Sequence, residues 1–566
     1  MKKSHSVIKA KQKASQLLQA NRLADAWDVY ERISRQAPGD HEVWLNMGAI
    51  AARQGQFERA ESALRRALTL RPDLPQANVN LARLLLMKQR LEEALPYLKK
   101  YLTLQPQDVD GYYQLGSLLE ALKNPSAAEE VYRQALPLAR KSVAIHIGLA
   151  RLLRLKGEYA AASAQCDLTL QLKPDAALAY FELGQIHREQ HRFDEALSCF
   201  ERLIALAPNE RENYLLNLGL LHVEQGRYDE ALANYRALIE FNPKSVYAHW
   251  NYSLLLLLTG NFKAGWAEYE WRRQTHFWQG QMWQGEFAPP RWAGEPLVGR
   301  TLLIYAEQGF GDTIQFVRYL PLLQAQGARV IFHCQPSLLG LFQRIPGLEV
   351  EPRNFDKAQQ TGFDYHLPLM SLPHLLGTTV ATIPATLAYL KADPERVAAW
   401  RARIDPCRFN VGLAWAGSIT NPKDRWRSVS LAQLAPLAEM SGVTFYGLQK
   451  EGVTAEQKPF ADKMNLIDLA SELHDFDDTA AVIENLDLVI SIDSVVAHLV
   501  GALAKPVWTL IYFPVEWRWL LGRADSPWYP TMRLFRQNGA DPQWPAVIDD
   551  VVAALRHELI AGKQPR

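Results

Sequence analysis

The sequence predicts an α-helical repeat solenoid followed by two α/β domains with parallel sheets. In the first half of the chain, prolines, alanines and large apolar residues recur at intervals of about 34 residues, which is typical of stacked helix pairs. From residue 301 onward, short apolar runs alternate with amphipathic segments, which is typical of βαβ units. The chain has 566 residues, of which 48% are hydrophobic and 22% charged, so several globular domains are expected.

Charge and cysteine content argue against several classes of protein. The net charge is +1, so we expect no attraction to nucleic acid or to an anionic membrane. The four cysteines are scattered without C-x-x-C spacing, which argues against a disulfide framework and a zinc site. No apolar stretch follows the basic start, and none is long enough to span a bilayer. We therefore expect a cytoplasmic protein without a transmembrane segment.

The repeats keep a constant phase along the first half of the chain. Pro38, Pro72 and Pro106 lie 34 residues apart, as do Pro174 and Pro208. Alanines recur in one register at Ala26, Ala60, Ala94, Ala128, Ala162, Ala196 and Ala231. A larger residue follows each alanine by four positions, at Tyr30, Leu64, Leu98, Tyr132, Cys166, Phe200 and Tyr235. Glycines recur earlier in the unit, at Gly48, Gly116, Gly184 and Gly219. The small residues allow two helices to approach closely, the large residues fill the space between them, and proline ends the second helix.

These positions match the helix–turn–helix pattern of tetratricopeptide repeats over seven units. A degenerate eighth unit begins near Val246, with Gly265 in the alanine position and Tyr269 in the aromatic position. Residues 7–273 therefore resemble an array of about eight such repeats, a right-handed solenoid with a concave face. The family uses that face to bind peptides or proteins, so the resemblance implies a protein partner. The alternative is a scaffold or a dimerisation surface without a specific client.

The junction that follows, residues 274–296, is rich in aromatic residues. Five tryptophans crowd the segment 265–299, at Trp266, Trp271, Trp278, Trp283 and Trp292. A flexible linker would contain mainly glycine and serine. A nucleic-acid stacking platform would need a basic groove, and this segment is not strongly basic. We expect the last repeat to dock against the next domain.

Residues 297–390 read as the first α/β domain. A strand at 301–306 leads into a glycine-rich turn and then a helix at about 313–326, and a second strand follows at 329–334. The turn has neither the G-x-G-x-x-G of dinucleotide-binding folds nor the G-K-[ST] of a P-loop. Gly309 and Gly311 in this turn permit a ligand to approach the backbone closely.

Residues 410–560 read as the second α/β domain, after a bridge at 391–409. The strand 410–415 ends in a turn with Ser418, and a basic segment with Lys423 and Arg425 follows. The strand 443–448 is followed by Gln449 and Lys450. The last helix, at about 545–560, could cross back to the first domain.

A polar cluster follows the apolar run 486–490, at the start of a helix of small residues. Asp493, Ser494 and His498 belong to this cluster. In open α/β sheets, ligands bind outside the carboxyl ends of the strands, where helix N-termini favour anions. The alternative is that Asp493 or Ser494 is only a helix N-cap and that His498 is a packed helix residue.

Three motifs of this half together resemble those of the lipopolysaccharide heptosyltransferases, a family of two-domain GT-B glycosyltransferases. They are Gly311-Asp312, Arg425-Trp426 and Asp493-Ser494-x-x-x-His498-Leu499. Residues 310–316 and 520–530 also resemble the heptosyltransferase-like (glycosyltransferase family 9-like) domain of repeat-bearing bacterial proteins. The resemblance covers most of residues 297–560 and implies a GT-B fold of two Rossmann-like domains.

The resemblance also implies a mechanism. A nucleotide-sugar donor would bind mainly against the second domain, and the acceptor would approach the first. Asp312 would be the base that takes the acceptor proton during inversion, unless it merely caps its helix. The residues expected on the donor side are Gly309, Gly311, Ser418, Lys423, Arg425, Gln449, Lys450, Asp493, Ser494 and His498. Among them, Arg425 or Lys423 would stabilise the leaving diphosphate, Ser494 and His498 would hold it, and Asp493 would contact the sugar. GT-B enzymes commonly need no metal, so we expect neither a metal nor a cofactor.

Two departures from the family pattern leave the donor open. Val495 stands where the heptosyltransferases have glycine, and Arg427 stands where proline is usual. ADP-heptose is therefore not assumed. Our first hypothesis is a glycosyltransferase whose repeats recruit a protein acceptor, such as flagellin or another surface protein. The alternatives are a non-catalytic scaffold with a degenerate transferase half, and a saccharide or lipid glycosyltransferase that uses its repeats only for assembly.

Overall fold

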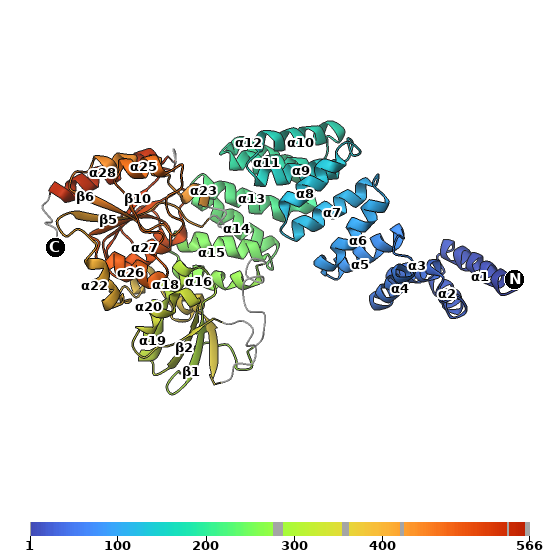
Figure 1. The fold of residues 1–566 in the computed structure, drawn as a ribbon, viewed down its shortest axis with the longest axis horizontal. Helices are drawn as coiled ribbons and strands as arrows, with labels where there is room; N and C mark the ends of the chain where they lie inside the picture. The colour runs from blue at the N-terminus through green and yellow to red at the C-terminus, as the bar shows by residue number, and fades with distance from the viewer. Residues whose placement is uncertain (1, 276–286, 354–361, 419–423, 540–542, 561–566) are drawn as a thin grey trace. The chain divides into compact units, whose positions relative to one another are not determined.

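The computed structural model of the chain describes residues 2–275, 287–353, 362–418, 424–539 and 543–560. It divides into two compact units, Met1–Tyr214 and Leu215–Arg566 (Figure 1). The predicted array of residues 7–273 is thus divided as well, because its last helices belong to the second unit. Each unit is described by itself below.

Residues 2–269 form antiparallel helix pairs, as the repeat pattern predicts. The first unit contains α1 (Lys2–Gln19), α2 (Leu23–Gln36), α3 (His41–Arg53), α4 (Phe57–Leu70), α5 (Pro75–Met87), α6 (Leu91–Leu104), α7 (Val109–Ala121), α8 (Pro125–Ala135), α9 (Val143–Leu155), α10 (Tyr159–Leu172), α11 (Ala177–Glu189) and α12 (Phe193–Leu206). Helix α13 (Arg211–Glu224) begins at the boundary, and α14 (Tyr228–Phe241), α15 (Val246–Leu258) and α16 (Phe262–Tyr269) belong to the second unit. The degenerate eighth unit is the pair α15–α16.

The recurring small and large residues meet inside the pairs. A Cβ atom added to Gly116 would lie 2.2 Å from the ring of Tyr132, which shows how closely α7 and α8 approach each other. The same addition at Gly184 would reach the ring of Phe200 at 2.5 Å. Such distances are below van der Waals contact, so glycine is required at these positions. The packing role predicted from the repeat is confirmed.

The first sheet has four parallel strands in the order β3-β2-β1-β4. They are β1 (Thr301–Tyr305), β2 (Arg329–Cys334), β3 (Glu349–Pro352) and β4 (Tyr365–Pro368). The helices of this part are α18 (Phe310–Phe316), α19 (Leu320–Ala325), α20 (Leu339–Gln343) and α21 (Leu372–Leu375). The single helix expected at 313–326 is wrong, because a 3-10 turn (Val317–Tyr319) separates α18 from α19. Pro321 explains the break, since proline lacks an N–H and its ring clashes with the preceding turn.

The second sheet has six parallel strands in the order β10-β9-β8-β5-β6-β7. They are β5 (Phe409–Ala414), β6 (Val443–Gly447), β7 (Ile467–Asp468), β8 (Leu488–Ile492), β9 (Val507–Ile511) and β10 (Met532–Arg536). The helices are α22 (Pro394–Arg401), α23 (Asp424–Arg427), α24 (Leu431–Leu434), α25 (Lys458–Lys463), α26 (Phe476–Glu484), α27 (Val495–Ala502) and α28 (Trp544–Ile560). Two parallel sheets with interleaved helices are compatible with the predicted Rossmann-like domains.

The last helix stays with the second sheet. Val547, Val551 and Leu555 of α28 are buried in one cluster with Trp508 and Phe535, which lie on β9 and β10. The expectation that this helix crosses back to the first domain is wrong. The apolar face of α28 covers the strands that directly precede it, so no crossing is needed to bury it.

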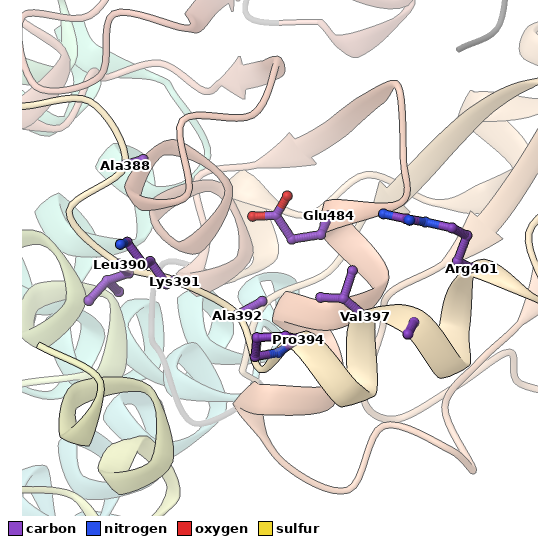
Figure 2. A pocket seen from close by; sticks show the side chains of 9 residues that line it. Ala388, Leu390, Lys391, Ala392, Pro394, Val397, Arg401 and Glu484 are labelled. Atoms are coloured by element: carbon purple, nitrogen blue, oxygen red, sulfur yellow. The ribbon is translucent and has the colours of Figure 1, made fainter.

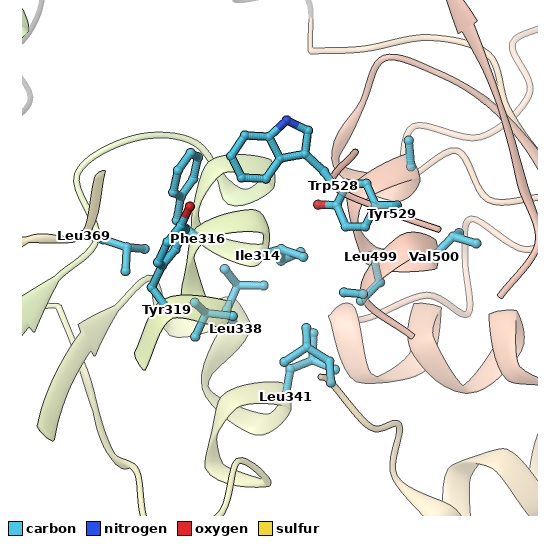
Figure 3. Packing of buried hydrophobic residues seen from close by; sticks show 14 of the residues in the cluster. Ile314, Phe316, Tyr319, Leu338, Leu341, Leu369, Leu499, Val500, Trp528 and Tyr529 are labelled. Carbon is cyan, nitrogen blue, oxygen red and sulfur yellow. The ribbon is translucent and has the colours of Figure 1, made fainter. Parts of the chain in front are cut away.

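The last repeat and the two sheets of the second unit share one core. Phe262 and Trp266 of α16 are buried with Phe316 of α18 and with Trp517 and Trp528. Figure 3 shows the part of this core between the sheets, where α18 and the 3-10 turn after it face α27 and the segment after residue 526. The expected docking of the last repeat is confirmed for the described residues. Trp278 and Trp283 of the junction lie outside them.

Candidate functional site

The predicted site residues gather where strands end. After β1 of the first sheet come Gly309, the N-cap of α18, and Gly311 and Asp312 in the first turn of that helix. In the second sheet, the segments after β5, β6 and β8 carry the other predicted residues. Helices α18 and α27, which follow β1 and β8, pack against each other. A Cβ atom on Gly311 would lie 2.8 Å from Cδ2 of His498, so glycine is what permits this contact. The carboxyl ends of β1 and β8 are therefore brought together.

Asp312 has two roles in this arrangement. It is the third residue of α18, and its Oδ2 accepts the N–H of Gly309 at 2.9 Å, so it does cap its helix. Its Oδ1 forms an ion pair with Nη2 of Arg518, which belongs to the other sheet's part of the chain. The Asp312 side chain is 23% exposed. The carboxylate is thus held in place from both sides and still reaches solvent.

Arg518 is the residue that the sequence analysis missed. It lies in a 3-10 helix (Trp517–Trp519) after β9 and is buried. Its guanidinium also pairs with Glu516, and its Nε donates to Oε1 of Gln315 at 2.7 Å. Burial acts to lower the pKa of Arg518, but Glu516 and Asp312 raise it above its usual range. The run Trp-Arg-Trp after an apolar strand was the available signal for a residue placed at this edge.

The turn between β8 and α27 is organised by serines. Ser494 is the N-cap of α27, because its Oγ accepts the N–H of Val496 at 3.3 Å. The hydroxyls of Ser491 and Ser494 lie 3.0 Å apart. Burial raises the pKa of the neighbouring Asp493 carboxyl, while Arg518 and Arg427 act in the opposite direction. An N-cap serine and a carboxyl whose pKa is raised by burial thus stand at one helix N-terminus.

His498 is buried between aromatic rings. Its Nδ1 lies 2.8 Å from the hydroxyl of Tyr529, and its ring is 5.6 Å from that of Trp519. Burial, together with Arg518 and Arg318, holds the pKa of His498 well below its usual range. A neutral imidazole in this position packs α27 against α18, which agrees with the alternative of a packed helix residue.

The ends of β5 and β6 are joined by hydrogen bonds. Oε1 of Gln449 accepts the N–H of Ala416 at 3.1 Å, and the N–H of Gly417 donates to Oγ of Ser428 at 3.1 Å. Ser418, at the end of this turn, is exposed. Lys450 is also exposed, and its ammonium donates to the carbonyl of Leu473.

The basic segment is described only in part. Lys423 lies outside the described residues, and so does the side chain of Arg425, whose backbone belongs to α23. Arg427 of the same helix donates from Nη1 to the carbonyl of Asp493 at 3.2 Å and from Nε to Asp424 at 3.1 Å. Arg427 therefore ties α23 to the segment that follows β8.

One pocket of this unit is lined by other residues. It has a volume of about 320 Å³ and lies along the bridge and α22, with Leu390, Lys391, Val397, Arg401 and Glu484 among its lining residues (Figure 2). None of the residues that line it is a predicted site residue. Across the described ranges, no helix is both long enough and apolar enough to cross a membrane. The same ranges hold no cluster of three or more His, Cys, Asp or Glu placed to bind a metal ion.

Comparison with protein families decides the nature of the first part of the chain. Models described as tetratricopeptide repeat match residues 12–75, 45–109, 85–152 and 175–244. The N-terminal region is a tetratricopeptide repeat array. A crystal structure of a tetratricopeptide repeat protein from Parabacteroides merdae covers 44% of this chain and 99% of its own, with 19% identity and a TM-score of 0.36.

Relatives extend the comparison beyond the tetratricopeptide array. Protein FlbA of Caulobacter vibrioides is 28% identical over 543 residues, which cover 91% of this chain and 84% of FlbA. The human protein O-mannosyl-transferase TMTC3 is 29% identical over 191 residues. That match covers 33% of this chain and 21% of the transferase. The similarity to FlbA therefore includes both the repeats and most of the α/β part.

Proposed function

We propose that this chain is a glycosyltransferase that moves a sugar from a nucleotide-sugar donor to an acceptor recruited by its repeats, a protein such as flagellin or another surface protein. The observation that carries the proposal is the pairing of Asp312 with Arg518 at the meeting edge of two parallel sheets. Ligands of open α/β folds bind at this edge. Similarity to proteins named O-mannosyl-transferases agrees with it, although this chain covers only about a fifth of TMTC3.

In this proposal the two sheets are the halves of a GT-B enzyme of the heptosyltransferase-like type. Asp312 takes the proton of the acceptor hydroxyl as the sugar is transferred with inversion. Arg518 holds that carboxylate in place through their ion pair. The leaving diphosphate lies at the N-terminus of α27, where the Ser494 hydroxyl and the positive end of the helix dipole favour an anion. Lys423, Arg425 and Lys450 supply positive charge on the donor side, and no metal is required.

The remaining predicted residues shape the donor side. Gly309 has no side chain, so a ligand can approach the backbone of the turn after β1 closely. Gly311 permits the contact of α18 with α27. Ser418 and Gln449 border the β5–β6 edge, and Asp493 contacts the sugar. His498 is buried and neutral, so it supports the N-terminal end of α27 by packing and not by charge.

A scaffold without catalysis is the second candidate, and one observation favours it. Both carboxylate oxygens of Asp312 are engaged within the protein, one by Gly309 and one by Arg518. A residue used only to cap a helix and join two sheets would show the same contacts. The third candidate transfers sugar to a saccharide or lipid and uses its repeats for assembly.

The acceptor separates these candidates. A surface protein co-expressed with the wild-type chain should gain the mass of one sugar, and it should not with Asp312→Asn, which keeps an oxygen for the helix cap. Intact-protein mass spectrometry measures the change. Transfer to a free saccharide that persists when the repeats of the first unit are removed would support the third candidate. No sugar on any acceptor would support the scaffold.

A further inference from the structure

A buried ion pair joins the last repeat to the turn that precedes Asp312. Arg272 lies in the 3-10 helix Glu270–Gln274 that follows α16, and Glu307 lies two residues after β1. Both side chains are 0% exposed. Nη2 of Arg272 lies 2.7 Å from Oε1 of Glu307, and Nε lies 3.1 Å from Oε2. This bidentate geometry fixes the orientation of both groups. Nη2 also donates to Oγ of Ser371 at 2.9 Å.

The other N–H groups of Arg272 are satisfied within the repeat. Nη1 donates to the carbonyl of Tyr269 at 3.2 Å and to Oε1 of Glu270 at 2.8 Å. Burial acts to raise the pKa of Glu270, but Arg272 and Arg291 lower it to about 2. A buried guanidinium with two carboxylates and full hydrogen bonding has one stable position. The end of the last repeat is therefore a rigid anchor.

The next residue of the turn is held by the same repeat. Nε2 of Gln308 donates to the hydroxyl of Tyr269 at 3.0 Å, and its carbonyl accepts Nε2 of Gln335 at 2.8 Å. Gly309 follows, and its N–H is the one that Asp312 accepts. Glu307 and Gln308 thus both contact side chains of the last repeat. They directly precede Gly309, the N-cap of α18, whose N–H donates to Asp312.

Arg518, the ion-pair partner of Asp312, lies in a segment that packs against the same last repeat, the pair α15–α16. Helix α15 contacts the 3-10 helix Trp517–Trp519, which carries Arg518. The ring of Trp266 meets that of Trp517 edge-on at 5.3 Å, and the ring of Tyr269 lies 6.2 Å from it. Both members of the Asp312–Arg518 pair are therefore supported from one side by α15, α16 and the segment after them.

From these contacts we infer that Arg272 and Tyr269 are positioning residues of the reaction: the last repeat sets the geometry of the candidate base and is a working part of the site. The inference rests on the proposed function and goes beyond it, because it assigns a role in the chemistry to residues outside the two α/β domains. A change in the position of the last repeat would then alter the site directly. A partner bound to the repeat array would change the rate of sugar transfer if its binding moved the last repeat.

The mildest test removes one hydroxyl. Tyr269→Phe loses the hydrogen bond from Gln308 and the weak one that the hydroxyl donates to Sδ of Met370 at 3.9 Å, and it keeps the ring in the core. Hydrogen exchange followed by mass spectrometry should show faster exchange in the peptide 306–316, with an unchanged melting temperature and unchanged exchange in β2. With sugar transfer as readout, kcat should fall about threefold to tenfold, as expected for the loss of the hydrogen bond to Gln308, while KM for the donor stays constant. Unchanged exchange in 306–316 would overturn the inference.

A double variant separates positioning from stability. Arg272→Met with Glu307→Met replaces the buried pair by apolar side chains of similar length, a change that often preserves stability. Because Arg272 also pairs with Glu270 and Glu307 also accepts the N–H of Met370, we expect a lower melting temperature. At a temperature where both proteins are fully folded, we expect a fall in kcat of about tenfold or more. Unchanged kcat under that condition would show that the pair only joins the repeat to the sheet. Arg329→Met with Glu349→Met is the matched control, since that pair lies on the same sheet and is exposed.

Hydrogen exchange keeps this inference distinct from the proposed function. It requires no turnover, so an inactive wild-type chain would count against the proposed function alone. Faster exchange in 306–316 of Tyr269→Phe would still support control of the turn by the last repeat.

Discussion

Asp312 and Arg518 form the residue pair on which the proposed glycosyltransferase activity depends. Asp312 could be found in the sequence, because a Gly-Asp pair at the start of a helix is a local pattern. Arg518 could not be found in that way, since it comes from the segment after β9 and meets Asp312 only through the packing of two sheets. His498 was found, but the sequence could not show that it is buried and neutral.

Removing Arg518 should destabilise the fold. Arg518→Met leaves the carboxylates of Asp312 and Glu516 without their cation, which we expect to cost about 3–5 kcal/mol of unfolding free energy. Arg518→Lys keeps the charge but loses the forked geometry, so its cost should be smaller. Urea denaturation measures both. Arg523→Met, which breaks a pair with the exposed Asp525, is the control and should change stability little. Equal effects at 518 and 523 would contradict this role.

His498 predicts how stability depends on pH. Its pKa lies well below 6.5 in the folded protein and returns to about 6.5 in the unfolded chain. As the pH falls below 6.5, the unfolded state binds a proton that the folded state does not, so stability decreases by up to about 1.4 kcal/mol per pH unit. His498→Gln should reduce this loss between pH 6.5 and 5. Urea titrations at the two pH values measure it, and an identical loss in both proteins would refute the assignment.

At the scale of elements, strand and helix types were predictable and some boundaries were not. The apolar runs marked β1, β5, β6, β8 and β9, and the 34-residue period marked the helix pairs. The break between α18 and α19 follows from Pro321, a local signal that the predicted helix ignored. The place of α28 depended on which apolar surface remained uncovered, and that is a property of the folded sheet.

The contact of α18 with α27 makes Gly311 a sensitive position. Alanine favours a helix by about 1 kcal/mol over glycine, yet its Cβ would lie 2.8 Å from the His498 ring. We expect Gly311→Ala to destabilise the chain by about 1–3 kcal/mol, as other overpacked cores do. Gly39→Ala is the control, because a Cβ there meets nothing within 4 Å. A higher melting temperature of Gly311→Ala would contradict the close contact of Gly311 with the His498 ring.

At the scale of the whole molecule, the last repeats and the α/β part form one compact unit. The sequence predicted a junction at residues 274–296, and its tryptophans correctly indicated that the last repeat packs against the next domain. The repeat pattern alone could not show that α14, α15 and α16 belong to the second compact unit. Their apolar side chains share a core with both sheets.

Truncation should reveal this shared core. A chain of residues 211–566 keeps the whole second unit and should fold with a cooperative melting transition. A chain of residues 297–566 would expose Phe316, Trp517 and Trp528, against which Phe262 and Trp266 pack, and it should aggregate. Size-exclusion chromatography and thermal melting distinguish the two. Cooperative melting of a monomeric 297–566 would show that the last repeat is dispensable for the fold.

Nucleotide release from a panel of nucleotide sugars, measured for the wild-type chain and for Asp312→Asn together with donor binding, decides whether Asp312 is the base of a glycosyltransferase. We expect the wild type to release nucleotide from at least one donor, and release to fall at least about a hundredfold in Asp312→Asn while binding of that donor is retained. If neither protein binds any donor, or if both release nucleotide at the same rate, the assignment of a glycosyltransferase with Asp312 as its base is contradicted.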